Sequence, residues 1–340
     1  MITIIGAGPI GCYLAYLLAE KNKVEVYEEH KDIGKPVQCA GIVTGEIERF
    51  NFELDKFVIN KTDKIKIYSR NNCVELKIKP EYIIDREKFD KYLYEKAKSK
   101  NVKFYFNHRF LGVNKDKIIL TKKKFKKDVL ILANGPDIKK KCYYGIQCRA
   151  KLKSAYEVYF NVNDFFSWIV PEGNGICRIG MASKDKNIKK KNYDFLKLKK
   201  IKNRDIIDYQ SGLIPIFNNN ITYKDNIYSA GDAASQVKAT TGGGIIPGLM
   251  AADILADCIN NNKDYNKEIK KLNKKLRLHL KIRNILNKFS QEDYNYLLKL
   301  IKQKRIKKII EEESREFPLK LLIKLLVNEP RFLKFINKLF

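Results

Sequence analysis

Long apolar runs are absent from this sequence of 340 residues, and no stretch reaches the ~20 consecutive apolar residues that a membrane-spanning helix needs. The apolar run at the N-terminus starts at once, without a basic leader, and glycines interrupt it, unlike a secretory signal. We therefore expect a cytoplasmic protein. Peripheral attachment to the inner face of the cell membrane is the alternative.

Histidine is scarce, and the seven cysteines form no CxxC pair. The three histidines, His30, His108 and His279, lie far apart and show no ligand spacing, so the sequence predicts no metal site. We expect reduced thiols, as in a cytosolic protein, and a Cys142–Cys148 disulfide has no support from the pattern. Glycine and proline are also few, and 44% of the residues are hydrophobic, which favours a packed core over disorder.

Acidic residues are outnumbered by basic ones, 39 to 68, which gives a formal net charge of +29. Such a charge can attract an anionic membrane or nucleic acid. It can equally reflect a general bias towards lysine that spreads charge over the whole chain. No basic motif with interleaved aromatics stands out, so nucleic acid is not the expected partner.

A dinucleotide-binding pattern opens the chain. The apolar run 2–5 precedes GAGPIG, an apolar helical segment and the second apolar run 24–27, which predicts a β–α–β unit. Gly6, Gly8 and Gly11 have the GxGxxG spacing that permits a tight turn, approach of a pyrophosphate, and close packing of helix on strand. Glu28 ends the second strand, where a carboxylate can accept the ribose hydroxyls of an adenosine.

Later segments favour FAD over NAD. Asp232 follows the apolar strand IYSA and resembles the aspartate of the second flavin fingerprint, which binds the ribityl chain. The loop TTGGGI then leads into a helix, and its amides can face the pyrimidine edge of a flavin. Arg86 resembles the flavoprotein arginine near the FAD phosphates, with a solvated charge as the alternative. Ala133 is expected beside the adenine, or simply in the core.

The order of the elements predicts an α/β fold. We expect a doubly wound FAD-binding domain of the glutathione-reductase type, with an inserted antiparallel β substrate domain and a helical C-terminal region. The FAD-binding domain takes residues 1–46, 82–142 and 222–260. The substrate domain takes residues 47–81 and 143–221, and residues 261–340 form the basic helical region.

Taken together, GAGPIG, GKPVQCAG, DREKFD and GDAASQVKATTGGGI resemble the geranylgeranyl reductase family of flavoproteins, which includes digeranylgeranylglycerophospholipid reductases. The family belongs to the p-hydroxybenzoate hydroxylase superfamily, and the resemblance covers about residues 1–260. It implies that the PVQC cysteine, Cys39, lies by the isoalloxazine as an active-site residue; a small packed residue is the alternative. The implied FAD-binding residues are Gly6, Gly8, Gly11, Glu28, Cys39, Ala40, Gly41, Arg86, Ala133, Asp232, Gly243, Gly244 and Ile245.

The stretch FFSWIVP resembles the family's YxWxFP motif, which walls the prenyl pocket. The resemblance assigns Phe166, Trp168 and Pro171 to substrate binding, although Phe166 stands where the family has Tyr and Val170 where it has Phe. From its residues alone, the segment would be interpreted as a core strand.

The family implies reduction of prenyl double bonds of a lipid, as in archaeal membrane lipid biosynthesis. Only one GxGxxG is present, so the expected electron donor is NAD(P)H bound transiently or a protein such as ferredoxin. An FAD-dependent monooxygenase or halogenase is the rival enzyme. The hydroxylases' middle Asp-Gly element is Asn134-Gly135 here, which disfavours that rival. A non-catalytic flavin-binding protein is a third alternative.

The C-terminal segment 317–340 alternates leucine, isoleucine and phenylalanine with lysine at helical spacing and is interrupted at Pro330. Basic amphipathic helices of this kind can lie in a membrane interface and bind anionic lipid. The alternative is that they pack on the substrate domain with their lysines in water.

Overall fold

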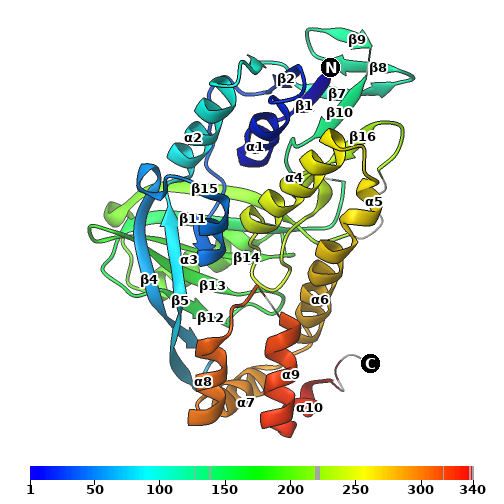
Figure 1. Cartoon of the computed structure of the whole chain (residues 1–340). Helices are drawn as coiled ribbons and strands as arrows, with labels where there is room; N and C mark the ends of the chain where they lie inside the picture. Colours follow the sequence, from blue (N-terminus) through cyan, green and yellow to red (C-terminus); the bar gives the residue numbers. More distant parts are fainter. Residues whose placement is uncertain (127, 138, 219–222, 317, 337, 339–340) are drawn as a thin grey trace. The chain divides into compact units, whose positions relative to one another are not determined.

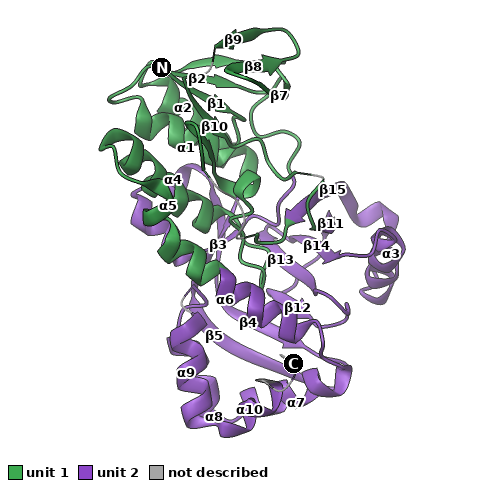
Figure 2. Cartoon of the chain, turned by 90° about the vertical axis from the view of Figure 1, so that its right-hand side faces the viewer, with its two compact units in different colours: residues 1–37, 85–141, 215–276 green, residues 38–84, 142–214, 277–340 purple. Residues whose placement is uncertain are grey.

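The computed structural model describes all of the chain except residues 127, 138, 219–222, 317, 337 and 339–340. It divides into two compact units (Figure 2). Unit 1 comprises residues 1–37, 85–141 and 215–276, and unit 2 comprises residues 38–84, 142–214 and 277–340. These boundaries differ from the predicted ones, because residues 38–46 belong to unit 2 and the predicted region 261–340 is divided between the two units.

Unit 1 contains a five-stranded parallel sheet in the order β16-β10-β1-β2-β6. Helix α1 contacts both α2 and α4 (Figure 1). Asp85 caps α2 by accepting a hydrogen bond from the Lys88 amide. The sheet strands are β1 (Ile2–Ile5), β2 (Val24–Tyr27), β6 (Lys103–Tyr105), β10 (Val129–Leu132) and β16 (Ile227–Ser229); the helices are α1 (Pro9–Leu18), α2 (Arg86–Lys98), α4 (Ile245–Asn260) and α5 (Tyr265–Glu268).

A small antiparallel sheet of β7 (Phe110–Asn114), β8 (Lys117–Leu120) and β9 (Lys124–Lys126) lies between β6 and β10 in the chain. The order strand, glycine loop, helix and parallel strand in residues 2–27 is the one expected from the apolar periodicity. The α/β character and the doubly wound first domain are therefore confirmed.

Unit 2 is built on an eight-stranded sheet in the order β15-β11-β14-β13-β12-β4-β5-β3. The sheet is antiparallel, as predicted, except at one pair, because β12 and β4 are parallel. These two strands come from different passages of the chain through the unit, so no hairpin joins them. The strands are β3 (Ile42–Thr44), β4 (Val58–Tyr68), β5 (Cys73–Ile84), β11 (Cys142–Lys151), β12 (Glu157–Tyr159), β13 (Ser167–Gly173), β14 (Ile176–Ser183) and β15 (Ile206–Pro215); α3 is Ile188–Leu198.

The described part of residues 261–340 is mainly helical, as predicted. Both α7 and α8 contact β5, so part of this region packs on the sheet of unit 2 (Figure 1). In the described part of the chain, no helix is long and apolar enough to cross a membrane. The helices are α6 (Lys270–Leu286), α7 (Gln291–Ile301), α8 (Lys304–Glu312), α9 (Pro318–Asn328) and α10 (Leu333–Ile336).

Candidate functional site

The glycine loop after β1 has room for a phosphate group. A Cβ atom at Gly11 would lie 1.9 Å from the Gly6 carbonyl oxygen, so α1 can approach the loop only without that side chain. Gly6 itself has φ +101°, a conformation that favours glycine. A Cβ at Gly8, in contrast, would meet no atom within 4 Å, so the space beside this residue is open. Gly8 also caps α1 without a side-chain hydrogen bond, and the helix start therefore fits a pyrophosphate.

Glu28 extends β2 and is held against the same loop. Its Oε2 accepts a hydrogen bond from the Ala7 amide at 2.7 Å. Its Oε1 accepts one from the His30 amide at 2.9 Å and lies 2.7 Å from His30 Nδ1. Each carboxylate oxygen can accept more than one hydrogen bond, so ribose hydroxyls can still bind there. The contact with His30 was not expected from the sequence.

Asp232 lies in a short 3₁₀ helix, Gly231–Ala234, directly after β16. No donor among the residues that the structure describes bonds to its side-chain oxygens. Burial raises the pKa of Asp232 to about 6, although the charge of Arg86 lowers it. A partly buried carboxylate is stabilised by hydrogen-bond donors, which such groups normally have. The hydroxyls of a ribityl chain are donors of the required kind, so Asp232 fits a flavin.

Arg86 makes two 3.1 Å hydrogen bonds from Nε and Nη2 to the carboxylate of Asp90, one turn further along α2. Burial raises the pKa of Asp90, and Arg86 opposes that shift. The alternative of a fully solvated helix-start charge is therefore wrong, because Arg86 is half-buried and paired. Its contact with FAD phosphate stays a prediction.

The loop before α4 lies close to Asp232. A Cβ at Gly244 would be 3.0 Å from Asp232 Oδ1. Gly244 caps α4 without a side-chain hydrogen bond, so the amides at Ile245 and beyond have no side-chain cap. Gly243 precedes it, its amide 3.4 Å from Thr241 Oγ1. Ala133 follows β10 and is half-buried. A Cβ atom added at Gly6 would lie 2.4 Å from the Ala133 carbonyl oxygen. The set in unit 1 thus fits the predicted dinucleotide.

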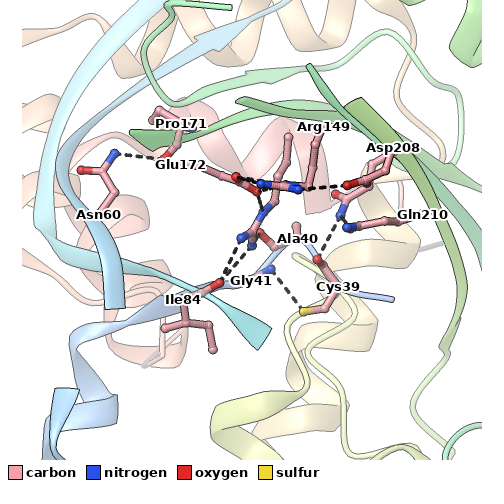
Figure 3. Close-up of polar contacts among 12 residues, drawn as sticks. Cys39, Ala40, Gly41, Asn60, Ile84, Arg149, Pro171, Glu172, Asp208 and Gln210 are labelled. Carbon is pink, nitrogen blue, oxygen red and sulfur yellow. Dashed lines mark hydrogen bonds and ion pairs between the residues drawn. The ribbon is translucent and has the colours of Figure 1, made fainter. Parts of the chain in front are cut away.

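The loop that contains Cys39 belongs to unit 2, where two side chains of the sheet hold it (Figure 3). The Cys39 carbonyl accepts a 2.9 Å hydrogen bond from Gln147 Nε2 on β11. The Ala40 carbonyl accepts a 2.7 Å bond from Arg178 Nη1 on β14. Gly41 N donates to Cys39 Sγ at 3.2 Å. A Cβ at Gly41 would lie 1.9 Å from Arg178 Nη1, so only glycine leaves room for the guanidinium.

Arg178 also belongs to a buried charge network. It pairs with Glu172, which accepts hydrogen bonds from Arg149 as well, and Arg149 Nη1 donates to Asp208 at 3.0 Å. Burial disfavours the charged form of Glu172. The hydrogen bonds from Arg149 and the charge of Arg178 nevertheless lower its pKa below the usual range. In Figure 3, dashed lines join Arg149 to the carboxylate of Glu172 on one side and to that of Asp208 on the other.

The aromatic residues expected at the substrate lie on β13 and just before it. Trp168 is buried, and its Nε1 donates to Gln147 Oε1 at 3.1 Å. Phe166 packs edge-on to Trp168, with ring centroids 6.1 Å apart. Pro171 is half-buried, and its carbonyl accepts a hydrogen bond from Asn60. Contact of these three residues with a substrate stays a prediction.

Sequence reasoning missed Gln147, Arg178 and Glu172, which join the predicted residues of unit 2. A signal was present, since Gln147 and Arg178 are polar residues that lie between apolar neighbours in β11 and β14. A buried polar residue in a central strand needs a specific partner. None of the seven cysteines forms a disulfide, so Cys142 is not joined to Cys148. The described residues contain no cluster that could hold a metal ion.

Residues 4–55 match the NAD(P)-binding Rossmann-like domain. The chain is 30% identical over 298 residues to an uncharacterized protein of Methanocaldococcus jannaschii, covering 76% of this chain and 74% of that protein. It is 25% identical over 352 residues to the digeranylgeranylglycerophospholipid reductase of the same organism, covering 87% of this chain and 89% of the relative.

The fold is shared with a geranylgeranyl bacteriochlorophyll reductase-like protein from Thermoplasma acidophilum. The TM-score is 0.78 at 20% identity, over 100% of this chain and 98% of the other. A flavin-dependent brominase has the same fold, with a TM-score of 0.70 at 13% identity over 96% of this chain and 99% of the other. The comparisons confirm the predicted fold class and support FAD as the cofactor.

Proposed function

Because the chain belongs to the geranylgeranyl reductase family of flavoproteins, we propose that it is an FAD-dependent reductase that saturates prenyl double bonds of a digeranylgeranyl glycerophospholipid. The observation that carries the proposal is the pair of carboxylates at the ends of two parallel strands of unit 1. Glu28 ends β2 beside the glycine loop, and Asp232 follows β16, where no described residue donates a hydrogen bond to its carboxylate. This pair fits the two ends of an FAD, the adenosine ribose and the ribityl chain.

Reduced FAD, when bound, supplies a hydride to one carbon of an alkene, and the other carbon takes a proton. An isolated alkene develops little charge that a protein could stabilise. Alignment of the substrate and exclusion of water are therefore the main contributions left to the chain. Phe166 and Trp168 provide apolar surface for this purpose. The Cys39 thiol, in a loop held by two hydrogen bonds, is the candidate to move a proton.

The rival activity is that of an FAD-dependent monooxygenase or halogenase, since a brominase shares the fold. The residues after β10 favour the reductase, because Asn134 stands where the hydroxylases carry an aspartate. Oxygen uptake coupled to oxidation of NADPH would support the rival. A yellow protein that photoreduces but reduces no prenyl lipid would instead support the non-catalytic alternative. NAD(P)H or ferredoxin remains the proposed electron donor.

Lipid mass spectrometry after co-expression with a geranylgeranyl-lipid pathway tests the proposal. The expected result is lipid whose mass rises by two hydrogens for each saturated bond, with no rise for the Asp232→Ala variant. Unchanged lipid with the wild-type chain, expressed in folded and FAD-loaded form, would contradict the proposal.

The helix α9 supports the second proposed partner, an anionic membrane surface. Leu319, Ile323 and Val327 recur every four residues on α9 and are 56%, 54% and 74% exposed. Residues at this spacing share one face of a helix. Lys320 and Lys324 flank the stripe, and both pair with Glu313. An apolar stripe beside lysines suits the interface of a bilayer with anionic lipids, where the proposed substrate lies.

A further inference from the structure

Gln147 occupies a space that a missing side chain provides. In the sheet of unit 2, Gly180 on β14 is directly opposite both Gln147 on β11 and Trp168 on β13. A Cβ at Gly180 would lie 2.4 Å from the Cβ of Gln147 and 2.5 Å from the Ile146 carbonyl oxygen. Real Cβ atoms never approach so closely, and one of the two contacts is backbone. Gly180 therefore allows the Gln147 side chain to cross its strand and reach the strand beyond.

The side-chain amide of Gln147 is buried and uses both ends. Its oxygen accepts from Trp168 Nε1 at 3.1 Å, while its nitrogen donates to the Cys39 carbonyl at 2.9 Å and to Gln210 Oε1 at 2.7 Å. The orientation of the amide follows from its partners. An indole N–H can only donate and a backbone carbonyl can only accept, so the oxygen must face Trp168 and the nitrogen must face Cys39.

We propose that Gln147 is a positioning residue that couples the Cys39 loop to the aromatic wall at Trp168. The inference rests on the proposed function, in which Cys39 acts at the reacting atoms and Trp168 contacts the prenyl chain. One amide then fixes both the loop and the wall, so that neither moves without the other. Gln147 itself need touch neither flavin nor substrate.

Two substitutions separate the two ends of the amide. Gln147→Met keeps the length of the side chain and removes both the acceptor for the Trp168 indole and the donor to the Cys39 carbonyl. Gln147→Glu keeps an acceptor for the Trp168 indole but cannot donate to the Cys39 carbonyl. Gln210→Ala is the matched control, because Gln210 accepts a hydrogen bond from the same amide nitrogen but is not part of the link between Cys39 and Trp168. Gln210 is half-exposed, so water can replace its side chain.

Two readouts do not depend on catalysis. Trp168 is the only tryptophan of the chain, so the intrinsic tryptophan emission reports on its indole alone. Alkylation of Cys39, followed by peptide mass spectrometry to separate it from the other six cysteines, reports on the loop. The full-length protein loaded with FAD is used throughout, and circular dichroism checks that each variant is folded.

Gln147→Met should shift the Trp168 emission and accelerate alkylation of Cys39 about tenfold, the factor that corresponds to about 1.4 kcal/mol. Gln147→Glu should accelerate alkylation to a similar extent while the emission stays near that of the wild type. With prenyl lipid, Gln147→Glu should lower kcat at a nearly constant KM, whereas Gln147→Met should also raise KM. Gln210→Ala should leave all of these values within about twofold.

Unchanged alkylation and emission in folded Gln147→Met would overturn the proposal, as would equal effects of Gln147→Met and Gln210→Ala. If Gln147→Met fails to fold, Gln147→Glu keeps both readouts, and Trp168→Phe, which removes the indole donor and with it the emission, is followed by alkylation of Cys39 alone, which should again be accelerated. A chain that reduces no prenyl lipid but shows the expected emission and alkylation would contradict the proposed function and leave the coupling intact. The two failures are therefore distinguishable.

Discussion

Replacing Arg178 by methionine should destabilise unit 2 more than the same change at Arg149. The Arg178 and Glu172 side chains are each only 6% exposed, and Arg178 also donates to the carbonyls of Ala40 and Ile84. Breaking a buried ion pair from one side costs about 3–5 kcal/mol. Because Glu172 keeps its two-pronged hydrogen bonds from Arg149, we expect the lower end, about 3 kcal/mol.

Thermal unfolding followed by circular dichroism measures this cost. At about 2–4 °C per kcal/mol for a unit of this size, the Tm of Arg178→Met should fall by roughly 6–12 °C. Arg149 is 31% exposed, so water can replace it at Asp208, and Arg149→Met should cost about 1 kcal/mol. Equal losses in the two variants, or no loss for Arg178→Met, would refute the reasoning from burial. The lowered pKa of Glu172 adds a pH dependence, because its contribution to stability is present at neutral pH and is lost as the pH falls through that lowered pKa.

Three further predictions concern the cofactor, the thiol and the membrane. The pKa of Asp232 is about 6 in the cofactor-free chain, and donors from FAD favour its charged form, so FAD affinity should be full above pH 6 and weaken below it by up to about tenfold per pH unit. Flavin fluorescence titration measures this affinity. A pH-independent affinity equal to that of Asp232→Asn would count against the prediction. Cys39→Ser should retain FAD, whereas Asp232→Ala should lose it on dialysis, at a cost of about 1.5–3 kcal/mol for the charge-assisted hydrogen bond; equal retention in the two variants would contradict this. Liposome co-sedimentation should rise with anionic lipid, fall with salt and weaken when Leu319, Ile323 and Val327 are changed to serine; absence of sedimentation at low salt would end the membrane proposal.

The dinucleotide unit could be predicted closely because its signals are local. The GxGxxG spacing constrains a single turn, and the clash that a Cβ would cause at Gly11 is with Gly6, five residues away. The antiparallel pairing of β4 with β5 is local in the same sense, because the two strands are joined by the short turn at Asn71–Asn72.

The anchoring of the Cys39 loop could not be predicted in the same way. Gln147 lies 108 residues from Cys39, and Arg178 lies 138 residues from Ala40. These pairs meet only because β11 and β14 are neighbours in the eight-stranded sheet. The parallel pairing of β12 with β4 is also non-local, since it joins two separate passages of the chain. Apolar periodicity identifies such strands but carries no information on their order in a sheet.

In the proposed reaction, flavin bound to this chain reduces an isolated prenyl double bond. The most direct test mixes the FAD-loaded, chemically reduced protein with a digeranylgeranyl glycerophospholipid in the absence of oxygen and follows the flavin absorbance, with the lipid mass measured afterwards. We predict that the flavin is reoxidised in proportion to the lipid and that each reoxidation adds two hydrogens to the lipid. Flavin that stays reduced with the lipid, yet is reoxidised at once by oxygen in the presence of an aromatic substrate that becomes hydroxylated, would contradict the proposed reaction.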